Sequence, residues 1–182
     1  MPHRHDLIAF IAAMVVVVTA SNVLVQYAIS DWLTWAAFTY PISFLVTDLT
    51  NRRLGPGAAR RVVYAGFALA VLLSALLATP RIALASGTAF LVAQLLDVRV
   101  FDRLRERAWW MPPLVSSLLG SAVDTVLFFA IAFHATGVPW VTLAIGDFAI
   151  KVVMALLLLL PFRGLLRLTR PVGAAASVEG NR

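Results

Sequence analysis

Three ionisable residues stand inside long apolar segments of the sequence, where they could bind a polar solute or an ion. Asp124 lies in the middle of residues 113–135, and Asp147 and Lys151 lie well inside residues 139–161. Each charged residue costs about 2.5–3.5 kcal/mol to insert at the centre of a membrane helix. Because buried charges in membranes usually line pathways, ligand or ion binding is favoured. The structural alternative is that Lys151 pairs with Asp147, four residues away on one helical face, or with Asp124 on the neighbouring helix.

Amide and hydroxyl side chains recur in the other apolar segments. A bare amide in lipid is costly, which makes Asn22, Gln26 and Gln94 candidate contacts for a solute. Hydroxyl groups such as that of Ser117 more often hold membrane helices together. The complete set of candidate substrate-binding residues is Asp124, Asp147, Lys151, Gln94, Asn22, Gln26, Tyr40, Asp48 and Ser117.

Two of the acidic residues, Asp48 and Asp97, fall near the predicted inner ends of their segments. For each of them a solvated helix end, or pairing with a nearby arginine, is the alternative to a functional role. The surrounding segments 44–49 and 90–95 are faintly similar to each other, which chance explains at least as well as an internal repeat.

The apolar segments have the length of membrane-spanning helices. Of the 182 residues, 61% are hydrophobic and only 13% are charged, whereas soluble domains carry about 25% charged residues. A helix needs about 20 residues to cross the hydrocarbon core, and the expected spans are 7–29, 32–49, 62–79, 81–97, 113–135 and 139–161. Pro80 separates the third span from the fourth, and Pro41 should kink the second. The sequence therefore predicts an all-α membrane protein with six transmembrane helices.

Arginine placement predicts how these helices are oriented. All but two of the 15 basic residues fall before the first span or in alternate connections and the tail, the exceptions being Arg81 and Lys151. Basic residues are enriched on the cytoplasmic side, so both the N- and the C-terminus are expected there. The expected organisation is a cytoplasmic N-terminus over residues 1–6, a six-helix domain over 7–161 and a flexible basic tail over 162–182.

Several enzyme classes are disfavoured by what the sequence lacks. It contains no cysteine, which excludes disulfides, thiolate metal sites and a cysteine nucleophile. The P-loop, HExxH and GxSxG motifs are also missing. We therefore expect neither an enzyme nor a resident cofactor or metal, and buried carboxylates and amides favour a discrete solute site over a channel. A membrane-embedded enzyme or assembly factor is the rival class.

Several short strings carry a resemblance to a known family. They are Thr34-Trp35, Phe44-Leu45-Val46-Thr47-Asp48-Leu49-Thr50-Asn51-Arg52, Arg81-Ile82-Ala83-Leu84-Ala85-Ser86, Gln94-Leu95-Leu96-Asp97-Val98, Val100-Phe101-Asp102-Arg103-Leu104-Arg105, Trp109-Trp110, Asp124-Thr125, Phe128-Phe129-Ala130-Ile131-Ala132-Phe133 and Asp147 with Lys151. In this order, from about Ser21 to Pro161, they resemble the queuosine precursor transporters, within the vitamin uptake transporter group of bacterial inner-membrane proteins. The one departure is the short link between the third and fourth spans.

The resemblance implies uptake of 7-deazaguanine precursors of queuosine, chiefly 7-cyano-7-deazaguanine and its aminomethyl relative, for tRNA modification. A carboxylate can accept two N–H donors of such a base, and Asp124 is the first choice for that edge. Asn22, Gln26 or Gln94 could satisfy the carbonyl or ring nitrogens. Aromatic side chains such as Phe44, Phe90 or Phe128 could stack on the ring. Asp147 and Lys151 would form a switchable pair or a second polar wall.

Energy coupling has three open forms at this stage. Asp124 or Asp147 could carry a proton in a symporter, transport could be passive and followed by metabolic trapping, or the chain could be a substrate-binding subunit that borrows a separate ATPase module. A transporter for another planar heterocycle or vitamin is a further alternative. The expected partners are a small-molecule substrate and the lipid bilayer, without direct contact to nucleic acid. Small residues in the helices would also permit a homo-oligomer.

Overall fold

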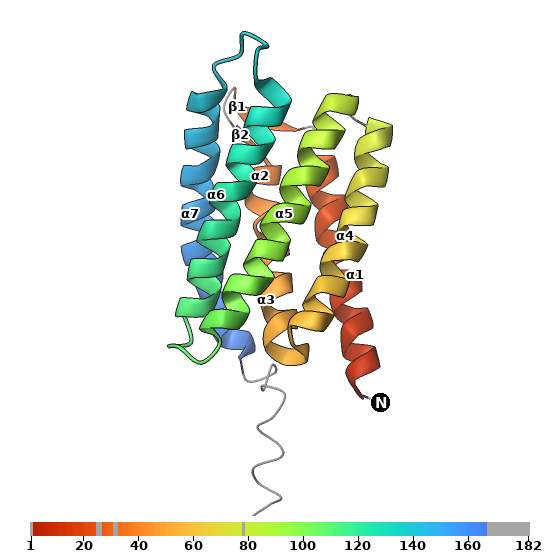
Figure 1. Ribbon diagram of the computed structural model, residues 1–182, viewed down its shortest axis with the longest axis vertical. Coiled ribbons are helices and arrows are strands. Elements are labelled where there is room, and N and C mark those ends of the chain that lie inside the picture. The colour runs from red at the N-terminus through yellow and green to blue at the C-terminus, as the bar shows by residue number, and fades with distance from the viewer. Residues whose placement is uncertain (1, 25–26, 31–32, 78, 167–182) are drawn as a thin grey trace, which may run out of the picture.

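Long helices packed side by side make up the protein. The computed structural model describes residues 2–24, 27–30, 33–77 and 79–166. Its elements are α1 (Pro2–Leu24), β1 (Ala28–Ser30), β2 (Leu33–Thr34), α2 (Ala36–Thr39), α3 (Ile42–Leu54), α4 (Pro56–Leu77), α5 (Pro80–Leu104), α6 (Met111–Phe133) and α7 (Trp140–Leu165). The start of α1 and the end of α7 lie at the same end of the bundle (Figure 1).

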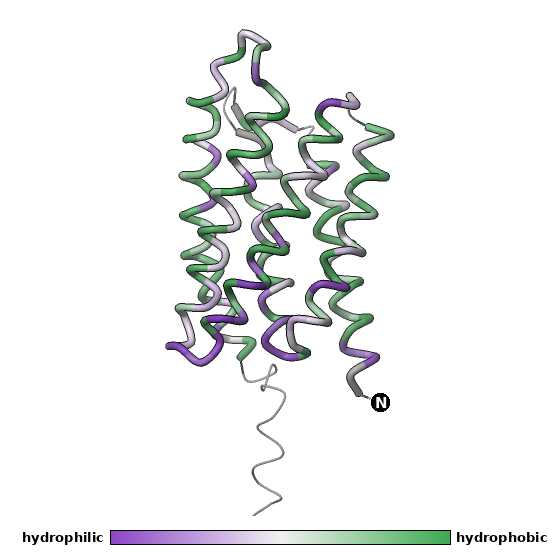
Figure 2. Tube along the Cα trace, viewed as in Figure 1, coloured by the Kyte–Doolittle hydropathy of each residue, from purple (hydrophilic) through white to green (hydrophobic). Residues whose placement is uncertain are grey.

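Five of these helices are long and apolar enough to cross a membrane. They are α1 from Arg4 onward, α4, α5, α6 and α7. Many large apolar side chains on their outer surfaces are exposed, for example Leu76 at 73% and Leu160 at 72%. Such a surface would be unfavourable in water but is suited to lipid. Figure 2 shows hydrophilic residues gathered at the end of the bundle where α1 begins, which is where the predicted cytoplasmic connections lie.

The second expected span is a broken segment rather than one helix over 32–49. Its first residues form β2, which pairs antiparallel with β1, so the first expected span also ends early, at Leu24. The helical part is divided at Pro41, as expected, because proline has no N–H to donate. The backbone N–H groups of Ser43 and Phe44 instead donate three residues back, to Tyr40 and Pro41. This short, kinked α2–α3 segment is the sixth candidate crossing.

The boundaries of α5 and α7 depart less from expectation. Thr79 caps α5 by accepting a hydrogen bond from the backbone N–H of Ile82 at 3.4 Å, and Pro80 occupies the first turn. This arrangement is favourable for a helix start. The helix α7 continues to Leu165, beyond the expected boundary at 161, and residues 167–182 of the predicted tail lie outside the described residues.

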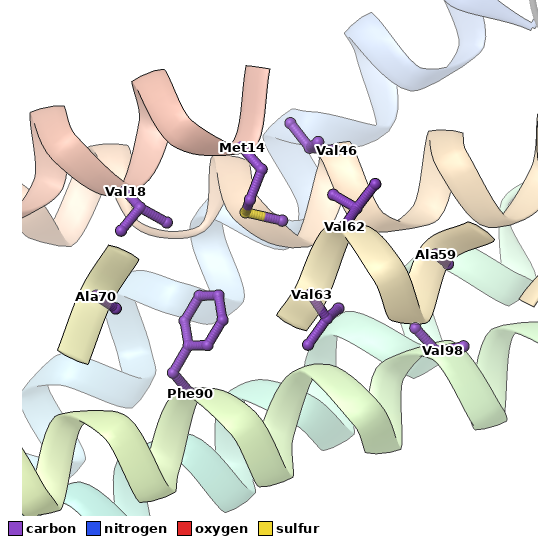
Figure 3. Packing of buried hydrophobic residues seen from close by; sticks show 9 residues of the cluster. All are labelled: Met14, Val18, Val46, Ala59, Val62, Val63, Ala70, Phe90 and Val98. Carbon is purple, nitrogen blue, oxygen red and sulfur yellow. The ribbon is translucent and has the colours of Figure 1, made fainter. Parts of the chain in front are cut away.

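An apolar core joins α1, α3, α4 and α5. Figure 3 shows its buried members, which are Met14, Val18, Val46, Ala59, Val62, Val63, Ala70, Phe90 and Val98. Close approach of the helices depends on small residues. A Cβ atom at Gly66 would lie 2.7 Å from Met14 Cγ, and one at Gly120 would lie 2.7 Å from Cε1 of the buried Phe44 ring. Gly120 thereby lets α6 pack directly against α3 and α5.

We predict that Gly120→Val lowers stability, because the Phe44 ring is 1% exposed and cannot move aside. Overpacking of this kind costs about 1–3 kcal/mol. The matched control is Gly146→Val, since a Cβ at Gly146 meets no atom within 4 Å. Thermal unfolding of the purified proteins in detergent measures the difference. Equal midpoint temperatures for the two variants would contradict tight packing at Gly120.

Candidate functional site

A closed ionic cluster lies where α6 and α7 meet the break between α2 and α3. The ammonium nitrogen of Lys151 on α7 is 2.7 Å from Asp124 Oδ2 on α6 and 2.6 Å from Asp147 Oδ2 on its own helix. The hydroxyl of Tyr40 donates to Asp124 Oδ1 at 2.9 Å. Thr125 accepts from Lys151 at 3.0 Å and donates to Asp147 Oδ2 at 2.7 Å. Both sequence-level pairing alternatives therefore occur together.

The two carboxylates of this cluster are differently available to a ligand. Both oxygens of Asp124 are engaged, and its side chain is 6% exposed. Asp147 is 23% exposed, and among the described residues no donor bonds to its Oδ1. The sequence-based first choice, Asp124, therefore has its acceptors occupied by Tyr40 and Lys151, whereas Asp147 offers an open acceptor.

The charge balance of the cluster favours a donor-rich ligand. Two carboxylates face one ammonium group, so the fully ionised cluster carries a net negative charge that hydroxyl donors only partly offset. Buried ion pairs contribute little to stability once their desolvation is counted. Lys151 also lies 5.6 Å from the centroid of the Tyr40 ring, and the edges of Phe44 and Phe90 pack around that ring. The cluster can thus accept N–H donors beside an aromatic wall.

Gln94 lies in a separate, fully satisfied network between α3 and α5. Its amide nitrogen donates to Ser43 Oγ at 2.8 Å, and its oxygen accepts from Thr47 at 2.6 Å. Asn51, one turn further along α3, donates to the backbone oxygen of Val98 at 2.9 Å. The two similar segments 44–49 and 90–95 therefore lie on neighbouring helices. The observed contacts of Gln94 join helices.

Asp48 and Ser117 meet at a second polar centre nearer the basic end of the bundle. Asp48 is 1% exposed and accepts from Ser116 at 3.2 Å and from Ser117 at 3.4 Å. A cavity of about 10 Å³ lies beside Asp48 and Ser117, against Phe162 of α7, which is room for about one water molecule. Asp48 is neither solvated nor ion-paired with any described arginine.

Asp97 is a buried acidic residue that the candidate set omitted, as it also omitted Thr125 and Ser116. It is 0% exposed, and neither carboxylate oxygen has a hydrogen-bond donor among the described residues. The polar side chains beside it are the carboxyl group of Asp48 and the hydroxyl group of Ser116. Its position near the end of an apolar segment suggested a solvated side chain. The one sequence signal for a role shared with Asp48 was its place just after residues 90–95, which resemble residues 44–49.

The remaining candidates lie elsewhere or outside the described residues. Asn22 donates to the backbone oxygen of Val18 at 2.9 Å, within α1. Gln26 lies outside the described residues. The observed ring contacts of Phe128 are with Phe129 and Phe133, on its own helix. The structure thus brings together Tyr40, Asp124, Asp147 and Lys151 in one cluster, and Asp48 and Ser117 in another.

Comparison with known proteins identifies the family. A family described as "Putative vitamin uptake transporter" matches residues 34–79 and 74–166. The chain belongs to this transporter family. The queuosine precursor transporter of Escherichia coli (strain K12) is 37% identical over 179 aligned residues, which cover 82% of this chain and 81% of the relative. With its apolar helices, this vitamin uptake transporter family member is a multi-pass protein of the bacterial inner membrane, and it is not an enzyme.

Two further relatives have similar names. The probable queuosine precursor transporter of Haemophilus influenzae is 34% identical over 157 residues, covering 72% of this chain and 67% of the relative. A probable queuosine precursor transporter of Bacillus subtilis (strain 168) is 28% identical over 150 residues, covering 65% of each chain. No solved structure matches this vitamin uptake transporter family member.

We predict that Lys151→Met destabilises the transporter because it leaves Asp124 and Asp147 buried without their cation. Removal of one partner from a buried ion pair costs about 3–5 kcal/mol. The triple variant Lys151→Met, Asp124→Asn, Asp147→Asn carries no unpaired charge and is expected to regain most of that loss. Thermal unfolding in detergent compares the variants. If the triple variant were no more stable than Lys151→Met, charge compensation would not be what Lys151 supplies.

Proposed function

We propose that this protein imports queuosine precursors, chiefly 7-cyano-7-deazaguanine and its aminomethyl relative, across the inner membrane. The names of the Escherichia coli and Haemophilus influenzae relatives support the substrate class. The observation that carries the proposal is the buried cluster of Tyr40, Asp124, Asp147 and Lys151, in which one carboxylate oxygen is open.

The chemistry of a 7-deazaguanine matches this cluster. Its pyrimidine edge presents adjacent N–H donors, and a carbonyl acceptor stands beside them. The carboxylate of Asp147 accepts the donors, as acidic side chains do in base recognition. Lys151 then donates to the carbonyl, so that binding exchanges part of the Lys151–Asp147 pair for contacts with the base. Asp124, held by Tyr40, keeps Lys151 in place during this exchange.

The depth of the cluster supports a transport site. At about 1.5 Å per residue, Asp147 lies about 10 Å and Lys151 about 16 Å from the start of α7 at Trp140, so the cluster lies near the middle of a hydrocarbon core of about 30 Å. Many secondary transporters bind substrate near the midplane. We place the arginine-rich end in the cytoplasm, following the positive-inside rule, so that Asp147 is the first of the four residues reached from outside.

We predict that Asp147→Asn strongly lowers uptake at low substrate concentration. Loss of a charge-assisted hydrogen bond to a bound base weakens binding by about 1.5–3 kcal/mol, or about tenfold to a hundredfold. The measurement is tRNA queuosine in a bacterium that can neither make nor import the precursors, supplied with 7-cyano-7-deazaguanine and expressing this chain. Glu106→Gln is the matched control, because it removes an exposed carboxylate in the connection after α5.

Each result of this assay separates one claim from another. Restored queuosine with the wild type and with Glu106→Gln, but not with Asp147→Asn, is the expected outcome. Full restoration with Asp147→Asn at normal membrane levels would refute the role of Asp147 and leave the substrate standing. No restoration by a wild-type chain that is inserted in the membrane would refute queuosine precursors as the substrate. Competition binding with other purines and vitamins would then follow.

A further inference from the structure

The two buried carboxyl groups of Asp48 and Asp97 are not explained by substrate recognition. They lie within hydrogen-bonding reach of each other, Asp48 on α3 and Asp97 on α5. Asp48 is 1% exposed and Asp97 is 0% exposed. The hydroxyls of Ser116 and Ser117 donate to Asp48, but no described residue donates to either oxygen of Asp97.

No cation of the described residues forms an ion pair with either carboxyl group. Lys151 is held by Asp124 and Asp147, and Arg105 is held by Asn51 and Asp102. The adjoining part of α6 contributes only serine hydroxyls. Two adjacent carboxylates in a nonpolar surrounding cannot both stay ionised, as in the paired carboxyl groups of aspartic proteases. A single proton shared by the two carboxyl groups would relieve this repulsion.

A sodium ion fits the same residues less well. A metal cation in a protein takes several oxygen ligands arranged around it at once, whereas the hydroxyls of Ser116 and Ser117 contact Asp48 and neither donates to Asp97. A proton shared between Asp48 and Asp97 needs no further ligands. It would also give one oxygen of Asp97 the hydrogen bond that this side chain lacks among the described residues.

Polar residues that could pass a proton to and from the pair lie on both sides of it. Ser117, Ser121 and Asp124 recur along one face of α6, and all three are buried, so a polar face connects the ionic cluster with Asp48. On the other side, Arg52 lies one helical turn beyond Asp48 toward the basic end, and its Nε is buried without a partner among the described residues. Arg52 would stabilise the ionised pair once the proton has left.

We propose that Asp48 and Asp97 form the proton-carrying site of the transporter, which makes uptake a proton symport. One proton enters from the outer side, is held between the two carboxyl groups and leaves at the basic end as the substrate is released. Since 7-cyano-7-deazaguanine is uncharged, each cycle moves one positive charge inward. This inference rests on the proposed function, because it requires transport of the base.

The test uses the full chain reconstituted into liposomes with a pH-sensitive dye inside. External 7-cyano-7-deazaguanine should acidify the interior of wild-type vesicles, and an acidic exterior should drive accumulation of up to about tenfold per pH unit. With Asp97→Asn, acidification should vanish and accumulation should fall to equilibration, while exchange of labelled for unlabelled substrate continues. Asp48→Asn is the second variant, and Glu106→Gln should behave as wild type.

The possible results distinguish this inference from the proposed function. Substrate exchange without proton movement in the wild type would overturn proton coupling and leave the substrate assignment intact. Uptake that requires sodium would overturn it in favour of a metal cation. Persistent acidification in both Asp97→Asn and Asp48→Asn would show that another group carries the proton. Absence of substrate exchange in the wild type would overturn the proposed function and this inference with it.

Discussion

A charged side chain inside a bilayer must find its compensation within the protein, and this requirement organises the interior around Lys151. Its ammonium group is held by carboxylates from α6 and from α7, and the Tyr40 hydroxyl at the break in α2–α3 completes the arrangement. Lys151 and Asp124 together thus join three segments in the interior of the bundle. Because the compensation uses two acids for one base, the interior keeps a surplus of acceptors, which is the feature a donor-rich solute needs.

The remaining helix contacts obey the same requirement in a different way. In lipid, burial of apolar surface gives little drive for helices to associate, so close packing and hydrogen bonds must hold them. Gly66 and Gly120 allow backbones and rings to approach, and Gln94 bonds to Ser43 and Thr47 across α3 and α5. The apolar side chains of Leu76 and Leu160 face outward instead. The polar interior and the apolar outer surface are therefore both consequences of the lipid environment.

Local sequence signals predicted the long helices and the kink at Pro41, because chain length, apolarity and the missing proline N–H act within a segment. They also gave the pairing of Lys151 with Asp147 or Asp124 as the structural alternative to ligand binding, since insertion cost restricts the options. They did not predict the β1–β2 pairing, because the same apolar residues suit a strand or a helix. The burial of Asp97 and the open oxygen of Asp147 were also missed, since both depend on which helices pack beside them.

The break in α2–α3 has a mechanical consequence that links the two polar centres. On the N-terminal side of the break, α2 packs against α1 and α7. On the C-terminal side, α3 packs mainly against α1, α4 and α5, and Gln94 of α5 donates a hydrogen bond to Ser43 of α3. Tyr40, at the break, reaches Asp124 on α6. A ligand that rearranges the ionic cluster therefore acts on α2 and Tyr40, whereas Asp48 belongs to α3. With the backbone hydrogen-bond pattern already interrupted at Pro41, the two pieces can move relative to each other at lower cost than within a continuous helix.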